Sequence, residues 1–532
     1  MNNKLFFLGW YILFLGWVNA QTELVFVFFK DKPNKSVFYA NPSSELTQKS
    51  LDRRINLGIA LNDQDAPLEI TYIQTIQNLG FAVTDKSKWL NGVAVNATSN
   101  QILQLRALPF VEKVESFVKN PAGKIAVLQN KFQESATNKM NFNYGLATDQ
   151  INQINLKPLH DGGYTGKGIT IAVIDTGFPT VDTGVAYERL RTNGQIKGGF
   201  NYLTKNSDIY NTTLSSHGSQ CLGTIGGYIE GNFVGSAPDA DFYLYVTEDA
   251  KKEVPEEELY LIQAAEEADR KGVDIITVSL GYNQFDDARY NYTYSDMTGE
   301  KSFVARGLQV ATEKGIFTLV SAGNEGSIAW KYITTPADNA KVFTIGAVTS
   351  TGSSSAFSSF GPNALGVVKP DAAARGTKTY FGYGNGAYSG DGTSYATPLA
   401  AGGVACLLQA LPKTTSREEI KQKLRETASL YPNINNQKGY GILNFGAIYS
   451  SYLSLIQLSK SPFKIYPNPV KNHLHIQSNE EIIEMELYDV SGRKIKNIQH
   501  KNRIDIADLH KGIYLIKVKT RTQSYIEKLI KE

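Results

Sequence analysis

The chain has 532 residues, of which 42% are hydrophobic and 20% charged, a composition that excludes a disordered protein. At roughly 150 residues per domain, this length predicts about three or four structural units. The formal net charge of +3 is small for the length and gives no indication of nucleic-acid binding, which usually requires a concentrated basic face.

The first 20 residues have the pattern of a signal peptide. Lys4 precedes an apolar run over residues 5–18, and Val18-Asn19-Ala20 provides a cleavage site before Gln21. A membrane anchor is the alternative, but this run is shorter than the roughly 20 residues that span a bilayer, and no later run is long enough. The sequence therefore predicts an exported protein without a transmembrane segment in its mature form.

Residues 21–120 predict a small α/β unit. A strand is expected at "ELVFVFF" (23–29), and helical patterns over 46–57 and 70–79 are closed by Gly58 and Gly80. A third helix is expected over 99–108, with Ser99 or Asn100 as its cap. Strands alternating with helices favour an α/β sandwich. The unit contains no histidine, and residues 121–142 are polar and weakly patterned, as in a linker.

Residues 143–455 form the central predicted unit. Apolar, β-rich runs alternate with helical patterns, which indicates an α/β fold with a mostly parallel sheet covered by helices on both faces. In such sheets the functional residues collect at the carboxyl ends of the strands. The apolar runs lie at 168–175, 240–246, 273–281, 315–324 and 340–348.

Residues 463–532 differ in texture from the central unit. Short alternating strands, broken by Pro, Asn and Gly, predict a small antiparallel β-sandwich. The chain has two cysteines, Cys221 and Cys406, both in apolar segments rich in small residues. We favour two buried thiols over a single disulfide.

Two of the six histidines lie in the central unit. His160 lies in "PLHDGGYTGKG", which predicts a surface turn before the first strand. His217 opens "HGSQCLGTIGG", a helical segment of small residues. A satisfied core histidine is the alternative there, but a histidine in the first turn of a buried helix favours a catalytic base.

Asp175 ends an apolar strand and precedes the turn Thr176-Gly177, which places a carboxylate at the carboxyl end of the strand. Alone, such an aspartate also fits a helix cap, a metal ligand or a ribose ligand. The dinucleotide motif G-x-G-x-x-G is not matched, because the glycines precede the strand. The P-loop is not matched either, because Asp161 replaces its first glycine.

Ser394 lies in "GDGTSYATP" (390–398), immediately before an apolar helical run. A serine becomes a nucleophile when a neighbouring base accepts its proton, and a helix beginning at Ser394 would direct unpaired N–H groups at an oxyanion. Pro398 is expected in about the first turn, where a missing N–H costs little. The G-x-S-x-G elbow is absent, because Ala396 replaces its second glycine. Asn324, at the end of another strand, is either an oxyanion donor or a turn residue.

With Asp175, His217, Asn324 and Ser394 in this order, the chain resembles the subtilisin-like serine proteases (subtilases, peptidase family S8). The motifs "IAVIDTG", "HGSQCLGTIGG", "SAGNEG" and "GTSYATPLAAG" carry the resemblance over roughly residues 145–455. It implies that Ser394 attacks the scissile carbonyl, that His217 transfers the proton and that Asp175 orients the imidazole. Asn324 and the Ser394 N–H would hold the oxyanion.

The resemblance implies further features of the family. Ser279, Leu280 and Gly281 would form the strand that pairs with the substrate backbone. No cofactor for catalysis is implied; structural calcium is left open, and no metal ligand is identified. Two departures stand out: the usual His-Gly-Thr-His is His217-Gly218-Ser219-Gln220, and an acidic, tyrosine-rich insertion over 282–300 is expected to reshape the specificity pockets.

The flanking units also resemble known ones. Residues 21–120 resemble the inhibitory propeptide of the family, with a βαββαβ order and self-cleavage within about 118–145. Residues 463–532 resemble the C-terminal sorting domain of the type IX secretion route, through "YPNPVKNHLHI", "ELYDVSGRKI" and "LHKGIYLIKV". These resemblances imply a zymogen exported through the periplasm of a Gram-negative bacterium, then released or held at the cell surface. Its expected partners are the type IX secretion machinery and its protein or peptide substrates. A catalytically weak adhesion protein on a protease scaffold is the alternative, against which the complete catalytic set argues.

Overall fold

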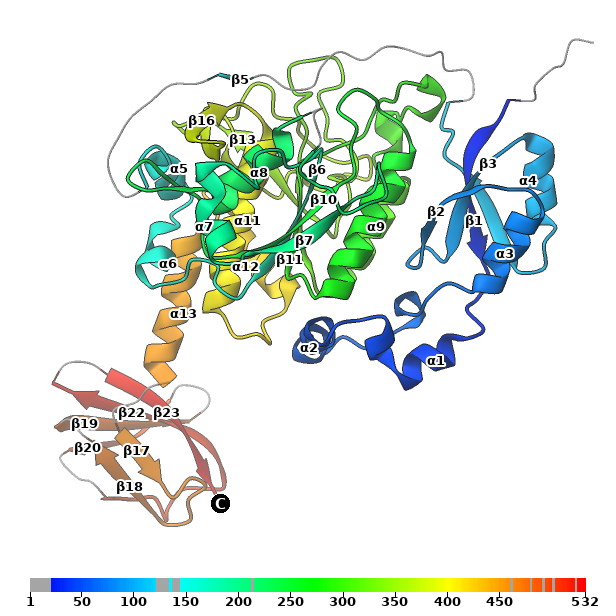
Figure 1. Cartoon of the computed structure of the whole chain (residues 1–532). Coiled ribbons are helices and arrows are strands. Elements are labelled where there is room, and N and C mark those ends of the chain that lie inside the picture. The colour runs from blue at the N-terminus through cyan, green and yellow to red at the C-terminus, as the bar shows by residue number, and fades with distance from the viewer. Residues whose placement is uncertain are drawn as a thin grey trace, which may run out of the picture. The chain divides into compact units, whose positions relative to one another are not determined.

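The computed structural model describes residues 21–120, 134–135, 144–211, 215–459, 463–478, 481–489, 493–499, 503–521 and 524–532 (Figure 1). The chain divides into two compact units, Met1–Gly446 and Ala447–Glu532. The predicted signal peptide and nearly all of the predicted linker lie outside the described residues. Among the described helices, none combines the length and the apolar character that crossing a membrane requires.

A seven-stranded sheet forms the centre of the first unit, and every pair of neighbouring strands in it is parallel. The strand order is β14-β13-β12-β11-β6-β10-β7. The five apolar runs correspond to the five inner strands, whereas the two edge strands β7 and β14 were not predicted. The strands are β6 (Thr170–Asp175), β7 (Ile196–Asn201), β10 (Asp241–Val246), β11 (Ile275–Val278), β12 (Phe317–Ser321), β13 (Phe343–Val348) and β14 (Ala372–Arg375).

Helices cover both faces of this sheet, which confirms the predicted α/β fold (Figure 1). One face packs on α8 (His217–Gly226) and α11 (Thr393–Ala410), and the other on α9 (Glu256–Lys271) and α10 (Phe303–Glu313). Because both faces are covered, β6, β11, β12 and β13 are buried along their whole length, whereas β10 leaves Asp241 and Tyr243 partly exposed. Four more α-helices lie in the described residues 144–444: α5 (Thr148–Gln153), α6 (Lys157–Asp161), α7 (Glu188–Thr192) and α12 (Arg417–Glu426).

Short antiparallel strands border the parallel sheet. One small sheet has the order β15-β16-β5, and β8 pairs with β9 in a hairpin. These strands are β5 (Glu134–Ser135), β8 (Tyr228–Ile229), β9 (Phe233–Val234), β15 (Thr379–Tyr383) and β16 (Gly386–Gly390).

The N-terminal segment folds as a four-stranded antiparallel sheet with the order β2-β3-β1-β4. Its order along the chain contains two more helices than the expected βαββαβ, because α1 and α2 precede α3 between the first two strands. The cap of α4 is Thr98 and not Ser99 or Asn100, because Thr98 and Gln101 form a reciprocal capping box. The elements are β1 (Glu23–Phe29), α1 (Lys35–Ala40), α2 (Gln48–Leu57), α3 (Ile70–Asn78), β2 (Val83–Ser87), β3 (Gly92–Ala97), α4 (Ser99–Arg106) and β4 (Val111–Ser116).

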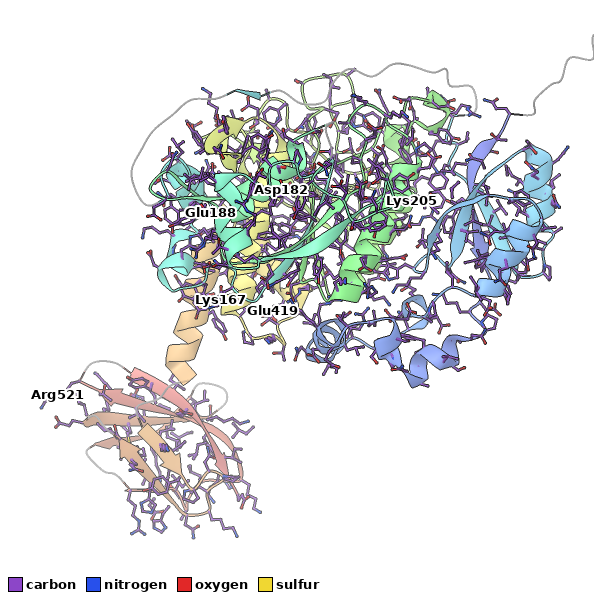
Figure 2. The ribbon with its side chains drawn as sticks, viewed as in Figure 1. Lys167, Asp182, Glu188, Lys205, Glu419 and Arg521 are labelled. Carbon is purple, nitrogen blue, oxygen red and sulfur yellow. The ribbon has the colours of Figure 1, made fainter. Side chains whose placement is uncertain are left out.

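The sheet of this N-terminal segment packs on α9 and α10, where Phe26, Phe28 and Phe117 lie against Phe303. Polar contacts reinforce this interface, two of them at separate places. At β2, Lys205 donates a hydrogen bond to the backbone oxygen of Thr84 at 2.7 Å and pairs with Asp85 at 3.3 Å (Lys205 is labelled in Figure 2). At α2, Arg53 donates to the backbone oxygens of Val273 and Lys314, at the amino ends of β11 and β12. The α2 contact therefore lies at the edge of the sheet opposite the carboxyl ends.

The second unit contains two antiparallel sheets around a core of its own, as the sequence predicts for a β-sandwich. One sheet has the order β17-β18-β21 and the other β20-β19-β22-β23. Helix α13 (Phe445–Ser459) precedes them in the chain. The strands are β17 (Phe463–Tyr466), β18 (His473–Ser478), β19 (Ile482–Asp489), β20 (Lys494–Gln499), β21 (Arg503–Asp505), β22 (Gly512–Thr520) and β23 (Ser524–Lys531).

Candidate active site

Asp175 is the last residue of β6, and its side chain is fully buried. Its Oδ1 accepts a hydrogen bond from the backbone N–H of Thr176, with an N–O distance of 2.8 Å. The same oxygen lies 2.7 Å from Nδ1 of His217. The turn after the strand thus fixes a carboxylate against the imidazole, at the carboxyl edge of the sheet where the sequence placed it.

His217 is the first residue of α8, a helix that is buried throughout. The close packing of this helix on β6 depends on Gly218. A Cβ atom at this position would lie 2.4 Å from the backbone oxygen of Gly177 and 3.0 Å from Cβ of Asp175. Glycine therefore allows the approach that brings the His217 ring onto the carboxylate.

Ser394 lies in the first turn of α11, which begins one residue earlier, at Thr393. Pro398 is consequently the sixth residue of the helix, beyond the first turn in which we expected it. Because Pro398 has no N–H, the carbonyl of Ser394 lacks its α-helical partner. That carbonyl instead accepts hydrogen bonds from Oγ of Ser279 at 3.0 Å and Sγ of Cys221 at 3.3 Å. The Ser394 hydroxyl contacts the backbone oxygen of Ser279 at 3.3 Å.

Asn324 follows β12, and its side-chain oxygen is engaged by the start of α11. Its Oδ1 accepts hydrogen bonds from the backbone N–H and from Oγ1 of Thr393, at 2.9 Å and 3.0 Å. Because the oxygen of the carboxamide is bound in this way, its NH₂ group is directed to the other side. The side chain is exposed and lines the same cavity as Ser394.

A cavity of about 330 Å³ connects the residues predicted to bind substrate. Ser394 and Asn324 line it together with Ser279, Leu280 and Gly281, so the structure brings these five predicted positions together. The remaining lining residues are Thr176, Glu248, Asp249, Ala250, Glu253, Asn283, Gln284, Ser321, Gly323, Glu325, Ile328, Thr334 and Thr393.

Among the polar lining residues that the sequence did not predict are Glu248, Glu253 and Thr334. Glu248 stands two residues after β10, so the strand-end rule that selected Asp175 would also have selected it. Glu253 and Thr334 lie in loops and reach the cavity through the tertiary fold, for which the sequence holds no local signal.

Gln220 occupies the position at which the chain departs from the usual motif. Its Oε1 accepts a hydrogen bond from the Tyr395 hydroxyl at 2.6 Å, and its Nε2 donates to Oγ of Ser216 at 2.9 Å. Tyr395 follows Ser394 and stacks on Phe381, with ring centroids 5.0 Å apart. The departure therefore provides a link between the helix of His217 and the helix of Ser394.

Both cysteines are free and buried, which confirms the prediction. Burial and the charge of Asp175 raise the pKa of Cys221 well above its usual value, so this residue remains a thiol. In the described part of the chain, Asp175, His217 and Cys221 lie close enough together to hold a metal ion, as do Glu248, Glu253 and Glu257.

His160 does not lie in a surface turn, so this prediction is wrong. It belongs to the short helix α6 and is partly buried. Its Nε2 and the backbone oxygen of Ser236 are 3.0 Å apart, and its Nδ1 is 2.9 Å from the Tyr144 hydroxyl. Burial lowers the pKa of His160, and the residue fastens neighbouring segments away from the cavity.

The insertion over residues 282–300 contacts both the cavity and the N-terminal segment. Asn283 and Gln284 line the cavity. The backbone oxygen of Arg289 accepts hydrogen bonds from the N–H groups of Lys119 and Asn120, at 2.8 Å and 2.7 Å. The influence of the insertion on specificity stays a prediction.

Three family models match successive stretches of the chain. The model of the subtilase family matches residues 166–441, slightly more than half of the chain. A peptidase S8 propeptide domain of Bacteroidota matches residues 24–136, and a secretion system C-terminal sorting domain matches residues 464–532.

Individual relatives extend this assignment. Subtilisin E of Bacillus subtilis (strain 168) is 25% identical over 433 residues, which cover 81% of this chain and 98% of that protein. Serine protease AprX of the same strain is 28% identical over 311 residues, covering 53% and 66% of the two chains. Subtilisin of Bacillus pumilus is 29% identical over 299 residues, covering 56% and 96%. This chain belongs to the subtilase family of serine-type endopeptidases.

Proposed function

We propose that this protein is a secreted serine endopeptidase, made as a self-processed zymogen, and that Ser394, His217 and Asp175 form its catalytic triad. The observation that carries the proposal is the buried contact of 2.7 Å between Oδ1 of Asp175 and Nδ1 of His217. The helix of His217 is in turn linked to the helix of Ser394 by the hydrogen bond from Tyr395 to Gln220. No cofactor is needed for this chemistry, because an imidazole can accept and return the proton.

In the proposed reaction, His217 accepts the hydroxyl proton as Oγ of Ser394 attacks the peptide carbonyl. Asp175 holds Nδ1 and stabilises the imidazolium that forms. The developing oxyanion accepts hydrogen bonds from the N–H of Ser394 and from the NH₂ group of Asn324. The two hydrogen bonds from Thr393 to the Asn324 side-chain oxygen set the orientation of that NH₂ group. The imidazolium then protonates the leaving amine, and water hydrolyses the acyl-enzyme by the same steps.

The flanking segments are proposed to control the time and the place of activity. Residues 21–120 would assist folding and hold the enzyme inactive until they are cleaved within about 118–145 and removed. The sorting domain would direct the chain to the type IX secretion machinery, so that the mature enzyme is released or held at the cell surface. The secretion-domain match at 464–532 supports this assignment.

Substitution Ser394→Ala tests the proposal. We expect it to abolish self-processing and peptide hydrolysis, with a loss of about 10⁶ in kcat, the value known for subtilisin itself. Asn324→Ala should lower kcat by about 10² to 10³, the loss seen at the oxyanion asparagine of subtilisin. Rates on a peptide mixture and the mass of the purified chain give the readout, with exposed Ser353→Ala as the control.

A Ser394→Ala protein that still processes itself and still cuts peptides would refute the triad. A wild-type protein without hydrolytic activity, unprocessed and unreactive toward a fluorophosphonate at Ser394, would favour the adhesion alternative.

A further inference from the structure

The cavity beside Ser394 has an acidic wall. Glu248 and Glu253 line it and are buried, with 4% and 3% of their surface exposed. Carboxylate oxygens of Glu248, Glu253 and Glu257 all lie within 4.8 Å of one another. Ionised carboxylates at this separation repel one another in a low-dielectric site, and a cation among them relieves the repulsion.

The three carboxylates have different tasks. Glu257 stands at the start of α9, and its two oxygens accept the backbone N–H groups of Asp249 and Val254, at 2.8 Å and 3.1 Å. It therefore fastens the loop on which Glu253 stands. Glu248 is positioned by the Tyr282 hydroxyl, which donates to it at 2.5 Å. Glu248 and Glu253 are the pair that faces the cavity.

Thr334 provides an independent observation in the same cavity. Its side chain is 1% exposed, and within the described residues its Oγ1 has no hydrogen-bond partner. If Gly281 carried a Cβ atom, that atom would lie 2.2 Å from this hydroxyl oxygen, and a Cβ atom at Gly323 would lie 3.2 Å from it. It therefore stands between the two segments that flank the cavity, where a bound group with N–H donors would satisfy it.

We propose that this cavity selects substrates with a basic side chain, Lys or Arg, close to the scissile bond. The aliphatic stem lies along Leu280 and Gly281, while the cationic end reaches the two glutamates and donates to Thr334. An apolar side chain would displace water from the two carboxylates and the Thr334 hydroxyl without donating a hydrogen bond to any of them, so substrates with such a side chain are rejected. The inference rests on the proposed function. The predicted self-cleavage segment offers several lysines, at Lys119, Lys124, Lys131 and Lys139.

Matched peptide substrates test the selectivity on the self-processed wild-type enzyme. The peptides differ at one position, which carries arginine, its neutral isostere citrulline, leucine or glutamate, and this position is moved along the peptide. We expect kcat/KM to be at least about tenfold higher for arginine than for citrulline at one position. Benzamidinium ion should compete with the arginine peptide, whereas neutral benzamide should not. These two tests need no variant.

Variants then locate the cause. Glu248→Gln and Glu253→Gln should each lower kcat/KM for the arginine peptide about tenfold and change it about twofold or less for citrulline. Thr334→Val should give a smaller loss of the same kind. Glu267→Gln, on the same helix as Glu257 but outside the cavity, is the control.

The outcomes separate three cases. A wild-type enzyme that cleaves peptides without preferring arginine overturns this inference and leaves the proposed function intact. If no peptide is cleaved at all, the proposed function fails. If Ca²⁺ raises the thermal midpoint of the wild type but not of Glu248→Gln or Glu253→Gln, the glutamates form a metal site, which also overturns the inference.

Discussion

At the scale of single residues, the carbonyl of Ser394 is as constrained as its hydroxyl. Pro398 removes the helical donor, and the carbonyl joins α11 to the end of β11 through Ser279 and to α8 through Cys221. The proline thus frees one acceptor, through which three elements meet at the proposed nucleophile. Because the pKa of Cys221 is raised by burial and by Asp175, its sulfur remains protonated and keeps donating to this carbonyl.

This arrangement predicts a coupling between Ser279 and Pro398. In a Ser394→Ala background that prevents self-digestion, Ser279→Ala should remove a hydrogen bond worth about 1 kcal/mol. The thermal midpoint should fall by roughly 2–4 °C. In Pro398→Ala, the new N–H can donate to the same carbonyl, so Ser279→Ala should then cost less. Equal shifts in the two backgrounds would contradict the shared acceptor.

At the scale of elements, helix α2 gives the N-terminal segment an anchor far from the cavity. Arg54 donates to Asp65 at 2.8 Å and to Asp269 of α9 at 2.7 Å, and Arg53 also pairs with Asp269. Lys314 pairs with Asp65 at 3.1 Å, and all five side chains are at most 3% exposed. Although burial opposes it, the charges of Arg54 and Lys314 hold the pKa of Asp65 below its usual range. Cleavage within 118–145 leaves this anchor in place.

The anchor predicts that the cleaved prosegment stays bound until this cluster is broken. Asp269→Asn should destabilise the association by about 3–5 kcal/mol, because it leaves two buried guanidinium groups without their shared carboxylate. We expect residues 21–120 to co-purify with the wild-type enzyme and to be lost from Asp269→Asn. Glu267→Gln, on the same helix in a more exposed pair with Arg270, should change the association by at most about 1 kcal/mol. Equal retention in both variants would contradict the anchor.

At the scale of the whole molecule, the sequence predicted those features that a local pattern of residues determines. The inner strands were predicted because continuous apolar runs mark strands covered on both faces. The edge strands were missed because β7 contains two glycines and β14 three alanines, residues with little preference for strands. His217 and Asp175 could be identified from strand and helix ends, whereas Thr334 and Glu253 depend on how loops converge in space. The helix start was expected within one residue of its place, but Pro398 still lies beyond the first turn, where its missing N–H deprives the Ser394 carbonyl of its helical partner.

We expect the two compact units to be independent of each other in stability and in function. The hydrophobic core of the second unit consists of residues from that unit alone. The cores of the N-terminal segment and of the sheet face covered by α9 and α10 consist of residues from the first unit alone. Because separate cores contribute nearly additively to stability, a chain ending at residue 459 should keep its thermal midpoint and, within about twofold, its rate of peptide hydrolysis. The shortened chain should nevertheless no longer be exported from the native host. Residues 463–532, fused to an unrelated periplasmic carrier, should cause that carrier to be exported. The fraction of each chain found outside the cells measures this effect. A shortened chain that is still secreted, or that loses hydrolysis together with export, would show that the second unit also serves the enzyme itself.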